Sequence, residues 1–361
     1  MTSRPSIALV ATVLNEQPRL ASWLGALDAQ TQPLDEIVLV DGGSDDGTWE
    51  TLQKWADRRG ATVIRAPGAG IAEGRNLAIS HTESEIIAVT DAGTRAGPCW
   101  LERLVNAIAE DVDVVSGFFV PELATRWDRA LAATTLPDAR DIDPERFQPS
   151  SRSLAFRRSW WDAGVRYPEW LDYCEDLVWD FAMRRAGARF RFVPDAVVEF
   201  SVRPSARAFA LQYYRYARGD GKAGLFAMRH ALRYVTYGGA AVVLARQRRG
   251  ELVVAGLLGL AYVRTPVRRL RDRDRERGVG WRSTVVAVPL AAGLRALGDL
   301  AKMVGYPVGL WWRLRCFGSL GWRTSWRRIS PEGVVWSPAA LPRGSRQPTS
   351  SPAGESRAAR P

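Results

Sequence analysis

The first ninety residues alternate between short apolar runs and longer segments in which apolar residues recur every three or four positions. Buried strands are predicted for the apolar runs at residues 6–14, 36–40, 61–66 and 85–90. Amphipathic helices are predicted at residues 18–30, 48–59 and 71–82, where periodic apolar residues such as Leu20, Leu24 and Leu27 fall on one face. Strands that alternate with helices of this length predict crossover connections and a mainly parallel α/β sheet.

The pattern is less regular between residues 113 and 203. Residues 113–119 predict another strand, and residues 179–186 predict a helix that Gly187 ends. Strands follow at residues 189–193 and 197–200. Residues 125–150 carry several prolines and aspartates and are interpreted as an excursion or lid rather than core. The first domain is therefore expected to cover residues 1–203.

The remaining residues have a different character. Apolar runs at residues 235–245, 252–263 and 285–294 are separated by arginine-rich segments and accompanied by Trp and Tyr. Each run is shorter than the roughly 20 residues that a spanning helix needs, so interfacial or re-entrant helices are expected. Residues 204–335 are interpreted as a basic, helical, membrane-associating region. Residues 336–361 are rich in Pro, Ser and Arg, which predicts a disordered tail.

The two halves of the chain carry opposite charge. Residues 1–200 contain 21 Lys or Arg and 31 Asp or Glu, whereas residues 201–361 contain 29 and 8. A basic, apolar segment is attracted to anionic lipid, by about 1 kcal/mol per residue near the surface. A soluble helical subdomain with a basic face is the alternative. No recognition motif accompanies the charge, so a nucleic-acid partner is not expected.

Cysteine and histidine usage excludes other classes. Cys99, Cys174 and Cys316 have neither disulfide nor metal-ligand spacing, and His81 and His230 match no zinc motif. The first twenty residues lack the features of a signal peptide, so the first domain is expected in the cytoplasm.

Polar residues follow three of the predicted strands. Asp41 ends the second strand and opens a Gly-Gly-Ser-Asp-Asp-Gly-Thr turn, and similar polar ends occur at residues 10–16 and 86–93. Open α/β sheets bind ligands at the carboxyl ends of their strands. This edge is therefore interpreted as a sugar-nucleotide site. The glycines at residues 68–74 do not have the spacing of a dinucleotide fingerprint, which argues against NAD.

Two acidic features could carry chemistry. Glu175 and Asp176 lie just before the predicted helix at residues 179–186, and apolar neighbours could raise the pKa of one carboxylate to that of a base. The alternative is that both acids only favour the helix dipole. Asp91 ends a strand and could hold a divalent ion or the ribose, or only form the turn.

Several of these segments together resemble the family 2 glycosyltransferases of the GT-A fold, over about residues 6–220. The similar segments are Thr12-Val13-Leu14-Asn15-Glu16, Val40 to Thr48, Gly74-Arg75-Asn76, Asp91-Ala92-Gly93, Glu175-Asp176 and Gln212-Tyr213-Tyr214-Arg215-Tyr216. The strongest resemblance is to the membrane-associated branch that builds bacterial exopolysaccharides of the succinoglycan type.

The resemblance implies a role for each matching residue. Thr12, Glu16 and Asp41 would contribute to donor binding, with Glu16 and Asp41 at the nucleoside, and Asp91 would lie at the diphosphate and metal. Asp176 would be the base of an inverting displacement, with Glu175 in support. The remaining candidates, Arg75, Gln212 and Arg215, would lie near the diphosphate or the acceptor.

This chain departs from the family pattern at the expected metal site. The family commonly has Asp-x-Asp where this chain has Asp91-Ala92-Gly93, so one acid is missing. An Mg²⁺ or Mn²⁺ ion would be bound more weakly, or held with the help of another group such as Asp45. Thr12 also replaces a usual proline, and Tyr216 a common tryptophan.

The leading hypothesis is an inverting glycosyltransferase at the inner face of a bacterial membrane. It would transfer a hexose from a UDP- or GDP-sugar to a lipid-linked or growing glycan acceptor. The alternatives are a sugar nucleotidyltransferase and a catalytically decayed protein that binds sugar nucleotides or acts as a membrane scaffold.

Overall fold

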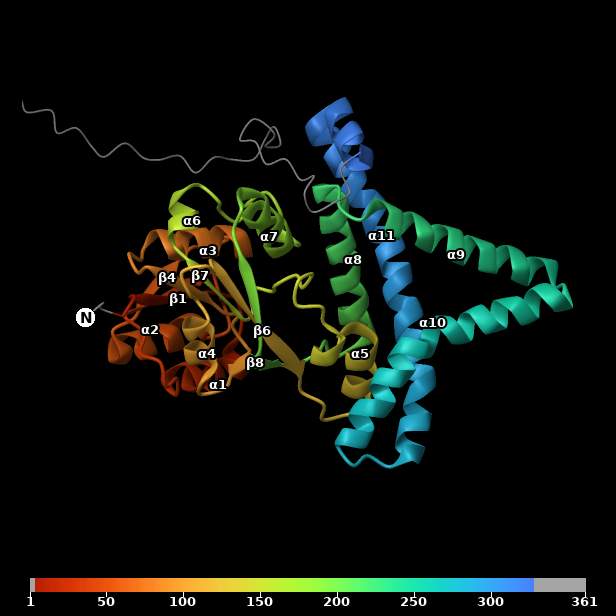
Figure 1. Ribbon diagram of the computed structural model, residues 1–361, viewed down its shortest axis with the longest axis horizontal. Coiled ribbons are helices and arrows are strands. Elements are labelled where there is room, and N and C mark those ends of the chain that lie inside the picture. The colour runs from red at the N-terminus through yellow and green to blue at the C-terminus, as the bar shows by residue number, and fades with distance from the viewer. Residues whose placement is uncertain (1–3, 328–361) are drawn as a thin grey trace, which may run out of the picture.

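The computed structural model describes residues 4–327 and contains one eight-stranded mixed sheet, in the order β3-β2-β1-β4-β7-β6-β8-β5 (Figure 1). The strands are β1 (Ile7–Val13), β2 (Glu36–Asp41), β3 (Thr62–Arg65), β4 (Ile86–Val89), β5 (Arg95–Ala96), β6 (Val114–Pro121), β7 (Leu154–Arg157) and β8 (Phe190–Phe200). Strands β3, β2, β1 and β4 are parallel, whereas β7 runs antiparallel to both β4 and β6. The mainly parallel mixed α/β sheet predicted from the sequence is confirmed.

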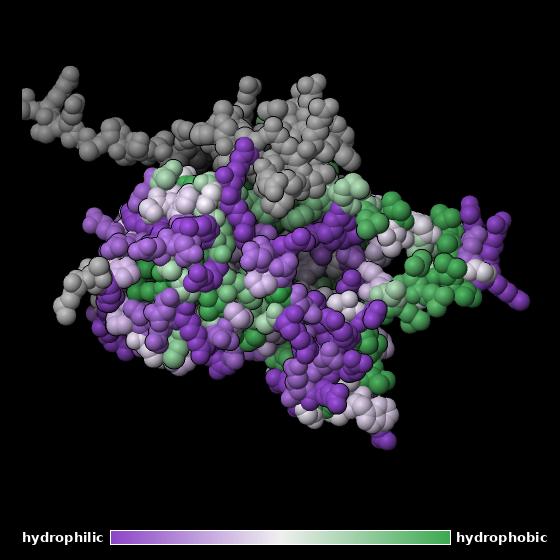
Figure 2. Space-filling model, viewed as in Figure 1, coloured by the Kyte–Doolittle hydropathy of each residue, from purple (hydrophilic) through white to green (hydrophobic). Residues whose placement is uncertain are grey.

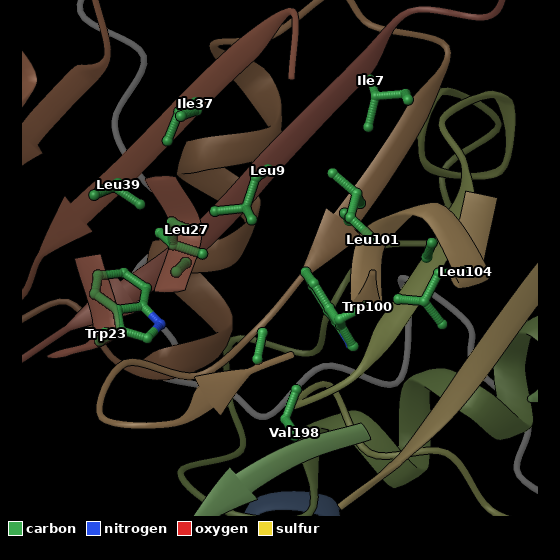
Figure 3. Close-up of a cluster of buried hydrophobic side chains, with 14 of the residues drawn as sticks. Ile7, Leu9, Trp23, Leu27, Ile37, Leu39, Trp100, Leu101, Leu104 and Val198 are labelled. Atoms are coloured by element: carbon green, nitrogen blue, oxygen red, sulfur yellow. The ribbon is translucent and has the colours of Figure 1, made fainter. Parts of the chain in front are cut away.

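Helices α1 (Gln17–Asp28), α2 (Thr48–Arg59), α3 (Ile71–Ser80) and α4 (Trp100–Asn106) flank the sheet. Alternate residues of β1 point to opposite faces, because side chains alternate along a strand. Ile7 and Leu9 join a core with Trp23 and Leu27 of α1 (Figure 3), whereas Ala8 and Val10 belong to the core on the other face. Both faces of β1 are therefore buried, which explains its uninterrupted apolar sequence.

Residues 125–150 contain a helix that the sequence interpretation missed. Helix α5 (Arg126–Thr135) begins with a capping box between Thr125 and Asp128 and is followed by the 3₁₀ turn η1 (Ala139–Asp141). For the helix, the interpretation as an excursion or lid rather than core was wrong, because Ala130 to Ala133 are buried. Their partners lie far along the chain on C-terminal helices, where a local pattern cannot show them: Phe209, Leu270, Ala287, Ala291 and Leu294.

The described part of the C-terminal region consists of long helices: α8 (Ala206–Ala223), α9 (Ala227–Arg246), α10 (Arg249–Glu276) and α11 (Trp281–Arg327). Helix α11 packs along α8 so closely that a Cβ atom at Gly305 or Gly309 would lie 2.1 Å from a backbone oxygen of α8. Helices α9 and α10 form a hairpin that projects away from the sheet (Figure 1). The predicted tail at residues 336–361 lies outside the described residues.

These helices extend well beyond the apolar runs of the sequence. Helix α10 continues through Pro266 and α11 through Pro289 and Pro307. By length and composition alone, α10 and residues Trp281–Cys316 of α11 could each cross a membrane. The apolar runs at residues 235–245, 252–263 and 285–294 underestimated the lengths of the helices, because the helices continue into the arginine-rich sequence beside these runs.

Candidate active site

The loops that follow β1 and β2 are joined by hydrogen bonds. The backbone N–H of Asn15 donates to Ser44 Oγ at 2.9 Å, and that of Glu16 donates to Thr48 Oγ1 at 3.0 Å. The Asn15 side chain accepts a hydrogen bond from the backbone N–H of Asp45 at 3.0 Å. The carboxyl ends of two adjacent parallel strands therefore form one ordered edge, as expected for a ligand site in this class of sheet.

Asp41 is fully buried at this edge. Its carboxylate accepts hydrogen bonds from the backbone N–H groups of Gly43 and Ser44, at 3.1 and 3.0 Å, and from the Ser44 hydroxyl. Gly43 has a φ of 99°, which favours glycine. Asp41 thus holds the turn after β2 in place, and its contact with a nucleoside stays a prediction.

Arg75 lies at the centre of the site because α3 packs very closely against β1. A Cβ atom at Gly74 would be 2.5 Å from Thr12 Cγ2, so glycine permits this approach. The Arg75 side chain is only 3% exposed and donates to Asp91 Oδ1 at 2.8 Å and to Glu175 Oε1 at 2.9 Å. Burial lowers the pKa of Arg75, but Asp91 and Glu175 more than offset this and raise it. One buried guanidinium therefore links two acids that the sequence separates by 84 residues.

Glu175 and Asp176 lie in the first turn of α7 (Glu175–Ala186), not before the helix as predicted. Cys174, immediately before them, has a left-handed backbone with a φ of 66°, a conformation that is rare outside glycine. Glu175 is buried, whereas Asp176 is half-buried and accepts a hydrogen bond from the backbone N–H of Leu177. Asp176 is therefore the acid of this pair that is more open to an acceptor.

The pKa of Glu175 is raised to about 7 by burial and by the neighbouring charge of Asp176, against the opposing effect of Arg75. An ordinary Glu ionises near 4.5, so folding disfavours the charged form of Glu175. The free energy of unfolding of the wild type should therefore fall as pH rises between these two values. Glu175→Gln, which cannot ionise, should lose less stability over the same range.

Urea unfolding of both proteins from about pH 5 to about pH 8 measures this difference. The curves should separate by an amount on the order of 3 kcal/mol at the upper end. Parallel curves for the two proteins would contradict the raised pKa of Glu175.

Glu16 lies beside the turn that contains Asp91. A Cβ atom at Gly93 would be 2.6 Å from Glu16 Oε2, so the Glu16 carboxylate occupies the space that the missing acid would need. Burial raises the pKa of Glu16, and the charges of Asp91 and Asp46 add to this while those of Arg19 and Arg203 oppose it. The predicted contact of Glu16 with the nucleoside stays a prediction.

Helix α8 approaches the same site from the C-terminal region. Arg215 donates to the Tyr173 hydroxyl at 3.0 Å, and Gln212 donates to the Tyr216 hydroxyl at 2.7 Å. A Cβ atom at Gly219 would be 2.6 Å from the carbonyl oxygen of Tyr173, so α8 packs directly on the segment that leads into Glu175. The C-terminal helices are thus in direct contact with the residues before the candidate base.

Sequence reasoning missed Arg152, just before β7, and Tyr167. Arg152 Nε lies 3.4 Å from Asp91 Oδ2, and the Arg75 guanidinium lies 5.2 Å from the centre of the Tyr167 ring. Both residues meet the site through contacts that are distant in the sequence. An arginine among serines and a tyrosine before a proline carry no recognisable local signal.

The donor set at Asp91 does not fit a divalent cation held by the protein. Within residues 4–327, no group of three His, Cys, Asp or Glu side chains is arranged to hold a metal ion. Both Asp91 oxygens face guanidinium groups, and Asp45, the predicted helper, is exposed. The expected Mg²⁺ or Mn²⁺ site at Asp91 is therefore not supported by the residues that surround it.

The mixed sheet carries acids and arginines at its strand ends, where open α/β sheets bind their ligands. Residues 9–161 match the model of glycosyl transferase family 2. This segment is therefore a family 2 glycosyltransferase domain, as its resemblance predicted, and the class of enzyme is confirmed. The mixed sheet flanked by helices, with a helical C-terminal region, confirms the predicted fold class.

Three similar proteins illustrate the relationship. Glycosyltransferase AglE of Haloferax volcanii is 27% identical over 61% of this chain and 75% of its own length. An undecaprenyl-phosphate 4-deoxy-4-formamido-L-arabinose transferase of Pseudomonas aeruginosa is 31% identical over 34% of this chain and 38% of its own length. The structure of mannosyltransferase PcManGT from Pyrobaculum calidifontis, in complex with GDP-Man and Mn²⁺, is 18% identical, covers 86% of this chain and 87% of its own, and has a TM-score of 0.49.

Proposed function

We propose that this protein transfers a hexose from a UDP- or GDP-sugar to a lipid-linked acceptor, with inversion, at the cytoplasmic face of a bacterial inner membrane. The single observation that carries the proposal is the bridge from Asp91 through Arg75 to Glu175, with Asp176 beside it. It joins a strand-end acid, where the donor diphosphate would lie, to an acid pair that can receive a proton.

The reaction would be a single displacement at the anomeric carbon. An acceptor oxygen attacks this carbon, Asp176 takes the hydroxyl proton, and the bond to the β-phosphate oxygen breaks with its electron pair left on the diphosphate. Arg75 would hold Glu175 and Asp91 on either side of the reacting atoms. Glu175 would be a second acid beside the base, Asp176. Gln212 and Arg215, through Tyr216 and Tyr173, would position the acceptor side. No step in this proposal uses a metal ion.

The C-terminal hairpin supports a membrane location. Large apolar side chains of α9 and α10 are exposed along its length, and Leu257 and Leu258 are 62% and 66% exposed. Figure 2 shows this apolar shaft in green with a hydrophilic tip, where Arg246, Arg248 and Arg249 lie. An exposed apolar face with arginines at its end is typical of helices that bind anionic lipid, whereas a soluble basic subdomain would bury its apolar side chains.

The names of relatives support a lipid-linked acceptor. Besides the undecaprenyl-phosphate transferase, a dolichol-phosphate mannosyltransferase of Pyrococcus furiosus is 26% identical over 38% of this chain and 44% of its own length. A membrane-bound hairpin would hold the site near such an acceptor. A growing polysaccharide acceptor is the alternative within the same reaction class.

Transfer assays with the full chain test this function. Labelled UDP- and GDP-sugars are supplied with vesicles of anionic phospholipid that contain either a lipid-linked glycan or a polyprenyl phosphate. We expect label in the lipid fraction, flotation of the protein with the vesicles, and loss of flotation in Leu257→Asp/Leu258→Asp with donor binding unchanged. Donor binding without any turnover would favour a decayed protein, and pyrophosphate release would favour nucleotidyl transfer. Wild-type protein that stays in solution would contradict the membrane location.

A further inference from the structure

Arg152 is held in a fixed place at the site by groups from three parts of the chain. Its guanidinium lies 5.5 Å from the centre of the Phe119 ring and 5.2 Å from that of Phe200, as a cation does over aromatic faces. Its Nε faces Asp91 Oδ2 at 3.4 Å. The side chain keeps 25% of its surface exposed, so a ligand can still reach it.

Tyr216 of α8 is a further polar neighbour of Arg152. Burial lowers the pKa of Arg152, but Tyr216, Asp91 and Asp176 together raise it, so the side chain is always charged. The Tyr216 hydroxyl itself accepts a hydrogen bond from Gln212 Nε2 at 2.7 Å. The α8 segment thus reaches the turn of Asp91 through Arg152.

The turn that contains Asp91 is surrounded by positive charge. Both Asp91 oxygens face arginines, and Gly93 stands where a second acid would hold a cation. A departing diphosphate needs a positive group, because negative charge develops on it as the sugar leaves. Arg75 is committed to two carboxylates at 2.8 and 2.9 Å, whereas the Arg152 contact with Asp91 is longer. Of these two, Arg152 has the weaker contact with a carboxylate, so it can donate to a new anion from the place where it is held.

We propose that Arg152 is a catalytic residue that binds the β-phosphate of the nucleotide diphosphate and stabilises it as it leaves, in place of a carboxylate-held divalent cation. The planar guanidinium can donate two parallel hydrogen bonds to phosphate oxygens. The electron pair of the broken sugar–oxygen bond stays on the diphosphate, and Arg152 donates hydrogen bonds without giving up a proton. This inference rests on the proposed function, because it assigns the diphosphate end of that same site.

Calorimetry with UDP and GDP, and with UMP and GMP, tests the assignment, in EDTA and again in Mn²⁺. The proteins are the wild type, Arg152→Met, Arg152→Lys and the control Arg146→Met, whose side chain is 87% exposed on a loop outside the site. In EDTA, the wild type should bind the diphosphate, and Arg152→Met should weaken this binding by about tenfold to a hundredfold. Monophosphate binding should change by less than about threefold, and Arg152→Lys should lie between.

Each other outcome overturns the inference in a recognisable way. Equal diphosphate binding by the wild type and both Arg152 variants would overturn the role of Arg152 alone. Equal losses for monophosphate and diphosphate would place its effect elsewhere than at the β-phosphate. Diphosphate binding by the wild type that requires Mn²⁺ would show that the arginine does not replace a cation. A wild type that binds no nucleotide in either condition would overturn the proposed function as well. Thermal unfolding checks that each variant is folded. If Arg152→Met is not folded, the comparison is made with Arg152→Lys.

Discussion

Asp176→Asn should lower turnover by about 10²–10⁴-fold while the protein stays folded and binds donor nearly as well as the wild type. Asn has almost the same shape as Asp but cannot take a proton from an acceptor hydroxyl. Asp176 is half-buried, and its Oδ1 contact with the backbone N–H of Leu177 can be kept by the Asn side-chain oxygen. The effect should therefore fall on kcat and leave donor affinity intact, which single-turnover assays and calorimetry measure separately.

Asp162→Asn provides the matched control, because Asp162 is an exposed acid whose partner is Arg158, outside the site. Its turnover should equal that of the wild type. Turnover by Asp176→Asn at the wild-type rate with a hydroxyl acceptor would contradict the assignment of Asp176 as the base.

The same variant also distinguishes two classes of acceptor. A sugar hydroxyl has a proton to lose when it attacks, whereas the oxygen of a phosphate monoester is already ionised near neutral pH, because its second pKa is about 6. A base therefore accelerates attack by a sugar hydroxyl, whereas attack by a phosphate oxygen does not need one. A large loss with a lipid-linked glycan and a small loss with a polyprenyl phosphate would therefore be consistent with one and the same site. The comparison identifies which acceptor depends on Asp176.

The sequence predicted the strand-end part of the site because that part is local. Asp41 ends one apolar strand and Asp91 comes two residues after another, and parallel strands bring such ends to one edge. The adjacent acids marked Glu175 as a candidate and the family resemblance added Arg75, but neither predicted their contact. The ion pair between them depends on the close packing of α3 on β1, which Gly74 permits beside Thr12. Spacing along the chain carries no information about such a contact.

Long-range packing hid the other features. Helix α5 has a short Ala- and Thr-rich sequence whose buried face is completed by residues of α8, α10 and α11. Arg152 likewise depends on Phe119, Phe200 and Asp91, from three other strands or turns. The predicted beginning of α7 was too late. The chain turns into the helix at Cys174, which has a left-handed backbone although it is not a glycine, so nothing in the sequence marks the turn. Each miss comes from a residue whose role is defined by partners that are remote in sequence.

Arg75→Met should destabilise the protein by about 3–5 kcal/mol, because it removes the positive partner of one buried and one partly buried acid. Met fills a similar volume, so lost packing contributes little. The cost comes from leaving Glu175 without a guanidinium partner and Asp91 with Arg152 alone. Urea unfolding followed by circular dichroism measures the loss. Arg65→Met is the control: Arg65 is half-exposed and lies 4.0 Å from Asp41, so its loss should change stability by less than about 1 kcal/mol.

The size of the Arg75→Met effect should depend on pH, since Glu175 can escape an unpaired charge by taking up a proton. Without Arg75 the pKa of Glu175 will rise further, so the variant should lose stability more steeply than the wild type as pH rises above about 7. Adding Glu175→Gln to Arg75→Met removes this charge and should recover part of the stability, whereas an independent pair of residues would show additive losses. If the double variant is no more stable than Arg75→Met at high pH, the buried bridge between Arg75 and Glu175 is not what holds this end of the site together.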